Sequence, residues 1–396
     1  MYIKADVLNK SERLFLLSPL IILLVAIFNF SDTKLILSRL IPIVSIYCLL
    51  RYREAFKENW RSELRSVFAS GLFLFVLFSI YHALRGDAFS LPRTLITSLA
   101  YLFFVPWSKI PKSWLYFLVV VAAIICGLNA MYEKFLLDIP RVGIATNPIP
   151  YALYVSFLVL SCLFLFLKNS SKAFKLVASI GGLLSLSAII MTDVRGVILF
   201  LPVVIFYLVV TTVRPTRKHF FVLLLSISAI SSVFYGIFKQ DIDARIRQTQ
   251  YEISMIEKGN HNTSIGIRFD LWKRGVEVIY QEPVFGLGDR GLQNSIASIT
   301  NRGAAIQPHL HNQYFDFLAR YGLVGSLATL ILCLAFIVRI ESGRLVWVSN
   351  PLINSMLMML LLAGLTDVPL HHTHIIYLLV IFCGVLVRFS CMGKSQ

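Results

Sequence analysis

Long apolar runs separated by short polar loops are the dominant pattern of this 396-residue chain. Runs of about 20 apolar residues are long enough to cross the hydrocarbon core of a membrane as helices. The pattern predicts twelve such helices, at 14–30, 35–50, 66–84, 94–107, 114–131, 151–168, 176–192, 197–213, 220–238, 318–338, 351–366 and 374–390. No small-residue cleavage site follows the first run and further runs come at once, so it is not expected to be a cleaved signal. We therefore expect an all-α polytopic membrane protein of about 12 transmembrane helices.

One connection, at 239–312, is much longer than the others. Connections of this length are usually functional or disordered, and this one is neither low in complexity nor poor in apolar residues. Apolar and charged residues mix at 241–258, which predicts an amphipathic helix at the membrane interface. A second helix is predicted over 267–280, and a glycine-rich turn follows at 285–288. The segment is therefore expected to be a large, mainly helical loop on one side of the membrane.

The chain is accordingly expected to have three parts. Residues 1–238 would form transmembrane helices one to nine, 239–312 the loop subdomain, and 313–396 transmembrane helices ten to twelve. Composition agrees with this plan, since 57% of the residues are hydrophobic and only 15% are charged, against about a quarter in soluble domains.

The net charge of +16 would suit a nucleic-acid-binding protein, but its distribution indicates a membrane topology. Lysine and arginine concentrate in alternate short loops and near the two termini, whereas the intervening loops hold few. The basic loops contain Arg51, Arg53, Lys57, Arg61, Arg65, Lys109, Lys112, Lys168, Lys172, Lys175, Arg214, Arg217, Lys218, Arg339 and Arg344. This bias is typical of the cytoplasmic side, so both termini are expected in the cytoplasm and 239–312 on the opposite side. No nucleic-acid partner is expected.

The six cysteines predict no chemistry. Five lie within apolar runs, none lies in 239–312, and no C-x-x-C motif is present. They are expected to be small core residues rather than a disulfide framework or a zinc site.

Two arginines stand at the outer ends of predicted elements. Arg195 lies in the tight break Thr192-Asp193-Val194-Arg195-Gly196 between two apolar runs. It suits either an interfacial snorkelling arginine, alone or paired with Asp193, or a bidentate contact to phosphate oxygens, with Gly196 letting a ligand approach the backbone. Arg268 lies near the start of the helix predicted over 267–280, which suits either a solvated helix face or a second phosphate contact at a positive helix end.

Histidines gather at two places on the same side. His309 and His311 form an H-x-H pair directly before an apolar run, and His371, His372 and His374 follow Asp367. Such a set suits a metal site, although no H-E-x-x-H motif or carboxylate cluster accompanies it. It equally suits a general base, because a neutral histidine accepts a proton near neutral pH. We expect no metal and, since no phosphate-binding G-x-x-x-x-G-K-[ST] motif is present, no nucleotide or other cofactor.

In their order along the chain these residues resemble the O-antigen ligase family of bacterial inner-membrane glycosyltransferases, which shares a domain with protein O-oligosaccharyltransferases. The resemblance covers nearly the whole chain. Its most specific motif is a histidine, ten residues and a glycine, which His311 and Gly322 match; counted from His309, the same spacing ends at Arg320. The other matching elements are the Arg195 turn, the Gly-x-Arg of Arg268 with Trp272 after it, Arg141-Val142-Gly143, and Gly364-Leu365-Thr366-Asp367.

The resemblance implies roles for these residues. His311 would be the catalytic base, Arg195 and Arg268 would bind the donor pyrophosphate, and supporting roles would fall to Arg141, Asp367, His309 and Trp272. It also implies the partners: a glycan on undecaprenyl pyrophosphate, a lipid A–core acceptor sugar, and the lipid of a bacterial inner membrane, with the active site facing the periplasm.

Three rivals to an O-antigen ligase remain open. An O-antigen polymerase would have a similar number of spans and the same donor. A protein O-oligosaccharyltransferase normally continues into a soluble C-terminal region, whereas this sequence ends at Gln396 soon after its last apolar run. A flippase or other transporter would place polar groups near helix midpoints, whereas here they cluster at outer ends.

Overall fold

The structure is a computed structural model that describes residues 8–218, 220, 236, 239–240, 243–244, 246–341, 344–347 and 350–391. The regular structure of these residues is almost entirely helical, and a single short hairpin provides the strands within the described ranges. The expected class, an all-α polytopic membrane protein, is confirmed.

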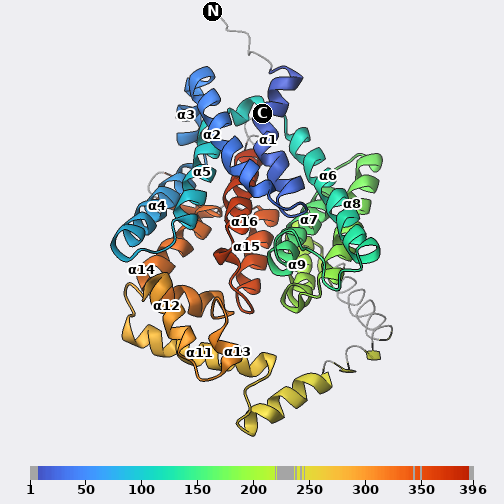
Figure 1. Ribbon diagram of the computed structural model, residues 1–396. Coiled ribbons are helices and arrows are strands. Elements are labelled where there is room, and N and C mark those ends of the chain that lie inside the picture. The colour runs from blue at the N-terminus through green and yellow to red at the C-terminus, as the bar shows by residue number, and fades with distance from the viewer. Residues whose placement is uncertain are drawn as a thin grey trace, which may run out of the picture.

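The first part of the chain forms one series of helices (Figure 1). They are α1 (Lys10–Ile21), η1 (Ile22–Ala26), α2 (Thr33–Arg51), α3 (Arg53–Trp60), α4 (Arg65–Arg85), α5 (Ser90–Phe104), η2 (Trp107–Lys109), α6 (Lys112–Met131), η3 (Tyr132–Leu136), α7 (Pro148–Lys168), α8 (Lys172–Thr192) and α9 (Arg195–Val213).

The second series holds the loop helices and the last membrane segments. They are α11 (Ser264–Gln281), α12 (Gly288–Ala297), α13 (Arg302–Ala305), α14 (Gln313–Ala335), β1 (Val338–Glu341), β2 (Arg344–Trp347), α15 (Pro351–Ala363), η4 (Pro369–His371), α16 (Thr373–Tyr377), η5 (Leu378–Cys383) and α17 (Gly384–Cys391). The strands β1 and β2 pair antiparallel.

Eight helical segments are long and apolar enough to cross a membrane, as expected of a multi-pass protein. Eleven of the twelve predicted runs coincide with helices, and the run at 220–238 lies almost wholly outside the described residues. Some matching helices are short: α5 has 15 residues and α15 has 13. The count of twelve spans therefore stays a prediction.

The helix predicted at 318–338 is displaced. It begins at Gln313, because the Asn312 side chain accepts hydrogen bonds from the backbone N–H groups of Tyr314 and Phe315 and caps the helix. It ends at Ala335, and the chain enters β1 at Val338. Sequence pattern alone placed the start too late, because the first turns contain polar residues that are nevertheless buried.

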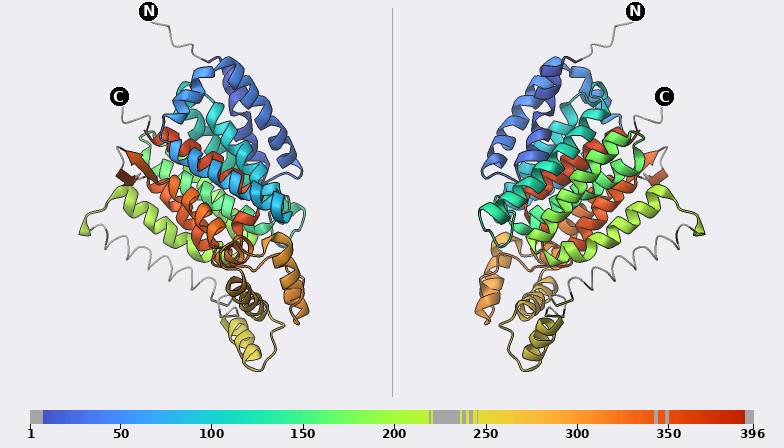
Figure 2. Two further views of the ribbon diagram at one scale, coloured as in Figure 1. Left: turned by 90° about the vertical axis from the view of Figure 1, so that its left-hand side faces the viewer. Right: turned by 90° about the vertical axis from the view of Figure 1, so that its right-hand side faces the viewer.

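The centre of the bundle is α7, which is enclosed by its neighbours α6, α8, α9 and α15. Tyr151, Tyr154 and Phe157 of this helix are buried completely. Asn147 caps the helix through its side chain, and Pro148 occupies the first position, where its missing N–H costs nothing. The long helices run side by side in an inclined stack in the side views of Figure 2.

One end of the bundle gathers the basic loops. Glu12 of α1 accepts hydrogen bonds from Tyr47 and Tyr52 at the end of α2, and Arg388 of α17 pairs with Glu58 of α3. The first and last described helices therefore reach the same end, which agrees with an even number of spans. The helices α11–α13 lie at the other end, in the lower part of Figure 1.

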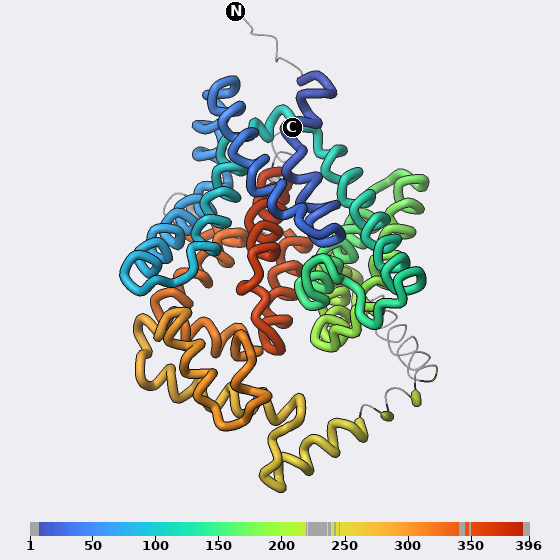
Figure 3. The backbone as a smooth tube through the Cα atoms, viewed as in Figure 1, coloured from blue at the N-terminus to red at the C-terminus, as the bar shows by residue number. Residues whose placement is uncertain are grey.

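These loop helices form a subdomain with a core of its own. Leu271, Val278, Leu292, Leu310 and Ala319 are buried together, and the last of them belongs to α14. The second helix, predicted over 267–280, is α11, whereas α12 and α13 were not predicted. Residues 246–257 are helical, which bears out part of the helix expected at 241–258 (Figure 3); residues 241 and 242 lie outside the described ranges. The three-part domain division stays a prediction.

The helix α14 is broken at Gly322, and the turn that precedes α12 packs against this break. Gly322 has a φ of 64°, which glycine adopts without strain, and a Cβ there would overlap the backbone of Val284. Around the break, Leu323 N–H donates to Pro283 O at 2.9 Å and Val324 N–H to Val284 O at 3.1 Å. Gly322 thus joins the subdomain to the membrane helix through the backbone.

The topology predicts that residues 239–312 face the side opposite the basic loops. Reporter fusions after Lys218 and after Lys258 should therefore report opposite sides of the membrane, because one span is expected between them. A fusion after Lys57, in a basic loop, should match the first of these. The same side for Lys218 and Lys258 would contradict the twelve-helix topology.

Candidate functional site

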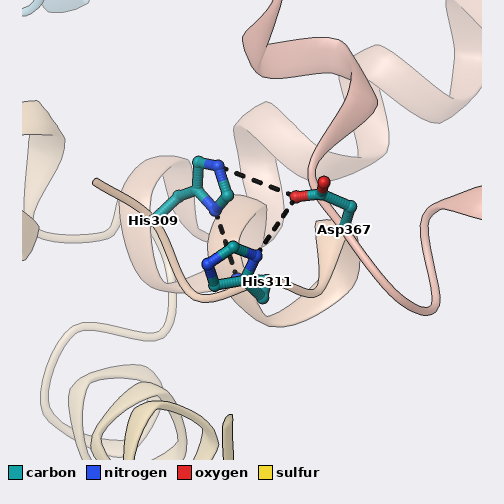
Figure 4. A group of neighbouring side chains, drawn as sticks. All are labelled: His309, His311 and Asp367. Carbon is teal, nitrogen blue, oxygen red and sulfur yellow. Dashed lines mark hydrogen bonds and ion pairs between the residues drawn. The ribbon is translucent and has the colours of Figure 1, made fainter. Parts of the chain in front are cut away.

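His309, His311 and Asp367 come together where α14 and the last membrane helices meet (Figure 4). His311 Nδ1 lies 3.4 Å from Asp367 Oδ1, and His309 Nε2 lies 3.7 Å from the same oxygen. The two imidazole rings are 4.4 Å apart, nearly perpendicular. The carboxylate is thus shared by two histidines that come from one loop.

The backbone of the histidine loop is fixed from three sides. His311 has a φ of 49°, an uncommon left-handed conformation, and its N–H donates to His309 Nδ1 at 3.3 Å. The N–H of Leu310 donates to Asp316 Oδ2, and Leu310 O accepts from the Trp272 indole at 3.0 Å. The His309 ring therefore helps to hold the backbone of His311 in position, because its Nδ1 already accepts the hydrogen bond from the His311 N–H.

Asp367 lies in the loop between α15 and η4, and that loop is bound to the start of α14. Asn312 Nδ2 donates to Leu365 O at 3.1 Å, and the N–H of Gln313 donates to Gly364 O at 2.8 Å. Val368 N–H donates to Asp367 Oδ1. These hydrogen bonds hold together two segments that are more than 50 residues apart in the sequence.

The electrostatics of the cluster favour a carboxylate on Asp367 and, at neutral pH, an uncharged ring on His309. Burial alone would raise the pKa of Asp367, but the hydrogen bond with His311 and the nearby charge of His309 hold it below its usual value. Burial lowers the pKa of His309 to about 4. Asp367 Oδ2 is enclosed and has no hydrogen-bond partner among the described residues, whereas most buried polar atoms in proteins have one.

Gln307 is a neighbour of the site that the sequence did not indicate. Its Oε1 lies 3.0 Å from His311 Nε2, and its Nε2 donates to Gly303 O at 2.9 Å, which orients the amide. Both nitrogens of the His311 ring thus face oxygens. This arrangement suits a ring that carries a hydrogen on each nitrogen, the form produced when a base has accepted a proton.

Arg195 lies at the break between α8 and α9, as predicted. It is exposed, and no hydrogen bond or ion pair joins it to the part of the chain that the structure describes. The expected role of Gly196 is wrong: a Cβ there would overlap Thr366 Oγ1, so the space over this glycine is filled by the chain itself. The close packing instead brings the Arg195 turn against the residue next to Asp367.

Arg268 and Trp272 are four residues apart on α11, so they share one face of the helix. Trp272 of that face contacts Leu310, between the two histidines. Arg268 is half-buried and forms no ion pair with a described residue. The two predicted arginines therefore lie on two different segments that contact residues next to the histidine–carboxylate cluster.

Arg141 is exposed at the same end of the bundle, and its Nε donates to Thr192 O at 3.0 Å. The contact ties the loop before α7 to the end of α8, three residues before Arg195. The Glu133 carboxylate also holds this loop, because its Oε2 accepts a hydrogen bond from the N–H of Gly143 at 2.6 Å. Arg141 is thus associated with Arg195 rather than directly with the histidines.

The second histidine group divides in two. The His371 ring lies 5.6 Å from that of His309, and burial lowers the pKa of His371. The ring of His374 lies 5.8 Å from Phe28, and Lys34 bonds to Thr373 beside it. His371 therefore extends the cluster, and the ring of His372 lies 6.1 Å from that of His371.

A metal ion remains compatible with the three central residues. His309, His311 and Asp367 each offer one ligand atom, and these atoms lie within 4.8 Å of one another. Zinc bonds of about 2.0–2.2 Å to such ligands place neighbouring ligand atoms about 3.4 Å apart, close to the separations at Asp367 Oδ1. The expected absence of a metal is therefore a prediction that needs its own experiment.

The comparisons with known proteins fit this geometry. Residues 180–330 match the family model described as O-antigen ligase, a range that includes Arg195, Arg268, His309 and His311. An uncharacterized protein of Haemophilus influenzae is 25% identical over an alignment 303 positions long, which covers 70% of this chain and 73% of that protein. The family match supports the resemblance drawn from the motifs.

Proposed function

We propose, on the premise that residues 180–330 carry the domain of the O-antigen ligase family, that this protein transfers O-polysaccharide from undecaprenyl pyrophosphate to a sugar of lipid A–core. The domain indicates an enzyme of the O-antigen ligase and polymerase type acting on polysaccharide and lipid-linked substrates in a membrane. The ligase reaction, the inner membrane and a periplasm-facing site are the proposal.

The observation that carries the proposal is the His311–Asp367 pair, with Arg195 and Arg268 on two segments that contact neighbouring residues. A carboxylate that faces one nitrogen of a histidine orients the ring and stabilises it once it has taken up a proton. The other nitrogen is then available to accept a proton from a hydroxyl group. His311 is the more accessible of the two histidines, with 21% of its side chain exposed against 8% for His309.

The reaction follows from these positions. The acceptor sugar hydroxyl attacks the anomeric carbon of the donor glycan and gives its proton to His311 Nε2. The bond between that carbon and the pyrophosphate oxygen breaks, and the electron pair leaves with undecaprenyl pyrophosphate. Gln307 Oε1 must move away from Nε2 to admit the hydroxyl, and it can accept a hydrogen bond from the protonated ring afterwards.

The arginines act on the departing group. Negative charge grows on the pyrophosphate as the bond breaks, and fixed cations at a partly dehydrated surface stabilise that charge. A guanidinium offers two parallel N–H donors to phosphate oxygens. Arg195 and Arg268 satisfy this need without a nucleotide, because the lipid-linked donor is already activated.

An O-antigen polymerase remains the nearest alternative, since it would use the same donor. The two differ in what deletion leaves behind. Loss of the ligase leaves the polymer intact on its lipid carrier and absent from lipid A–core, whereas loss of the polymerase leaves single units attached to lipid A–core.

If the arginines bind pyrophosphate in a bidentate manner, lysine cannot replace them. Arg195→Lys and Arg268→Lys should each lose most of the transfer activity at matched protein levels. Arg274→Lys is the control, because Arg274 pairs with Glu277 on another face of α11 and should keep its activity. Wild-type transfer rates in both test variants would reduce the two arginines to structural residues.

Metal independence is tested directly. Purified protein should transfer glycan at an unchanged rate in excess chelator, because arginines rather than a metal neutralise the leaving group. Loss of activity that one particular divalent ion restores would make His309, His311 and Asp367 its ligands.

Alanine substitutions of His311 and His309 are expected to have different effects on transfer. A general base typically contributes about 10²–10⁴-fold, so His311→Ala should lose transfer by that factor while the protein remains folded and inserted. His309→Ala should lose much less, through a looser loop. His261→Ala is the control, because it removes another histidine–aspartate pair, in which His261 lies in the loop before α11 at 2.6 Å from Asp270.

Rates of in vitro ligation with purified donor and acceptor lipids measure the losses in both variants. An active His311→Ala enzyme beside an inactive His309→Ala enzyme would reverse the assignment.

A further inference from the structure

A cavity of about 600 Å³ lies at the end of the bundle opposite the histidine site. It is bounded by the start of α6, the end of α7, the hairpin, the start of α15, and α17. The other end of α7 follows the Arg141 loop, and α15 runs from the cavity toward Asp367. The cavity is thus separated from the proposed active site by the length of the membrane helices.

The mouth of this cavity is cationic. Lys112, Lys168 and Arg339 line it, and no aspartate or glutamate is among the described residues that do so. Lys112 is the first residue of one candidate membrane span and Lys168 the last residue of another. Both lysines therefore lie at the level of lipid headgroups.

The depth of the cavity is mainly apolar. Leu115 and Val119 of α6, Leu165 of α7, and Phe382 and Leu386 of the last helices line it, and the Ser161 hydroxyl at this depth donates to Phe157 O. From Lys112 to Val119 the helix advances about 10 Å, at about 1.5 Å per residue. A cationic mouth above an apolar wall of that depth complements an amphiphile with a negatively charged head.

We infer that this cavity binds an anionic phospholipid of the membrane, with its phosphate at Lys112 and Lys168 and its acyl chains along α6 and α17. Basic pockets between membrane helices are suited to acidic headgroups, and each lysine near the surface contributes appreciably to the attraction. The lipid joins α6 and α7 to α15. The inference rests on the membrane bundle alone and is independent of the chemistry of the histidine site.

The test compares lipid binding by the full chain purified in neutral detergent. Native mass spectrometry and thermal unfolding should show phosphatidylglycerol retained and stabilising, and phosphatidylcholine not. Lys112→Gln/Lys168→Gln should bind phosphatidylglycerol about 30-fold more weakly, from the loss of two surface charges. The control is Lys10→Gln/Lys172→Gln, which removes two exposed lysines at the same end outside the cavity lining.

Three outcomes would overturn the inference. The first is equal retention of phosphatidylglycerol by the wild type and the cavity double variant. The second is an equal loss in the control double variant, which would mean diffuse surface attraction. The third is stabilisation by inorganic phosphate as strong as by phosphatidylglycerol, which would mean that the apolar wall plays no part.

Discussion

Asp316 and Arg320, one turn apart on α14, form a buried ion pair. Both the loop that carries His309 and His311 and the helical bundle are joined to this pair by hydrogen bonds. The Asp316 carboxylate accepts from Arg320 Nε at 2.8 Å and Nη2 at 3.1 Å, and from the N–H of Leu310. Arg320 Nη1 reaches Asp289 of α12 at 2.9 Å. Asp289 in turn accepts from Ala88 N–H, between α4 and α5. Removing one member of a buried pair typically costs about 3–5 kcal/mol, because the other charge is left unpaired.

This chain of contacts holds the segments of the site together at the end of the bundle. Loops at a membrane surface are ordinarily mobile, but here each segment around His311 is held by a polar contact to the next one. Asp316 holds the loop that carries His309 and His311, and Arg320 holds the subdomain through Asp289. Asn312 and Gln313 hold the loop that carries Asp367. General-base chemistry depends on such fixed geometry, because a displacement of about 1 Å is costly to the rate.

The sequence pattern predicted the positions of most helices but not the polar contacts between them. Apolar runs predicted the membrane helices, and the break at Arg195 was found where expected. Asp316 and Arg320 were missed, although opposite charges four residues apart at the start of an apolar helix are themselves a signal of a functional or paired site. Asp367 was indicated by resemblance alone, since contacts between segments more than 50 residues apart have no local pattern. The helices α12 and α13 are too short for periodicity to reveal.

The backbone contacts at Gly322 also have a consequence for the order of assembly. The turn at 283–288 and the break in α14 close a loop of short sequence separation. Other contacts of the subdomain are with earlier parts of the chain, such as Ala88, which are synthesised before it. Asp367 arrives from a segment synthesised later, after α15 has entered the membrane. Binding of the Asp367 loop to Asn312 and Gln313 is thus the last step that completes the site. During its own synthesis the protein holds its histidines in place while lacking their carboxylate, and the histidine–carboxylate cluster is complete only when the final helices are inserted.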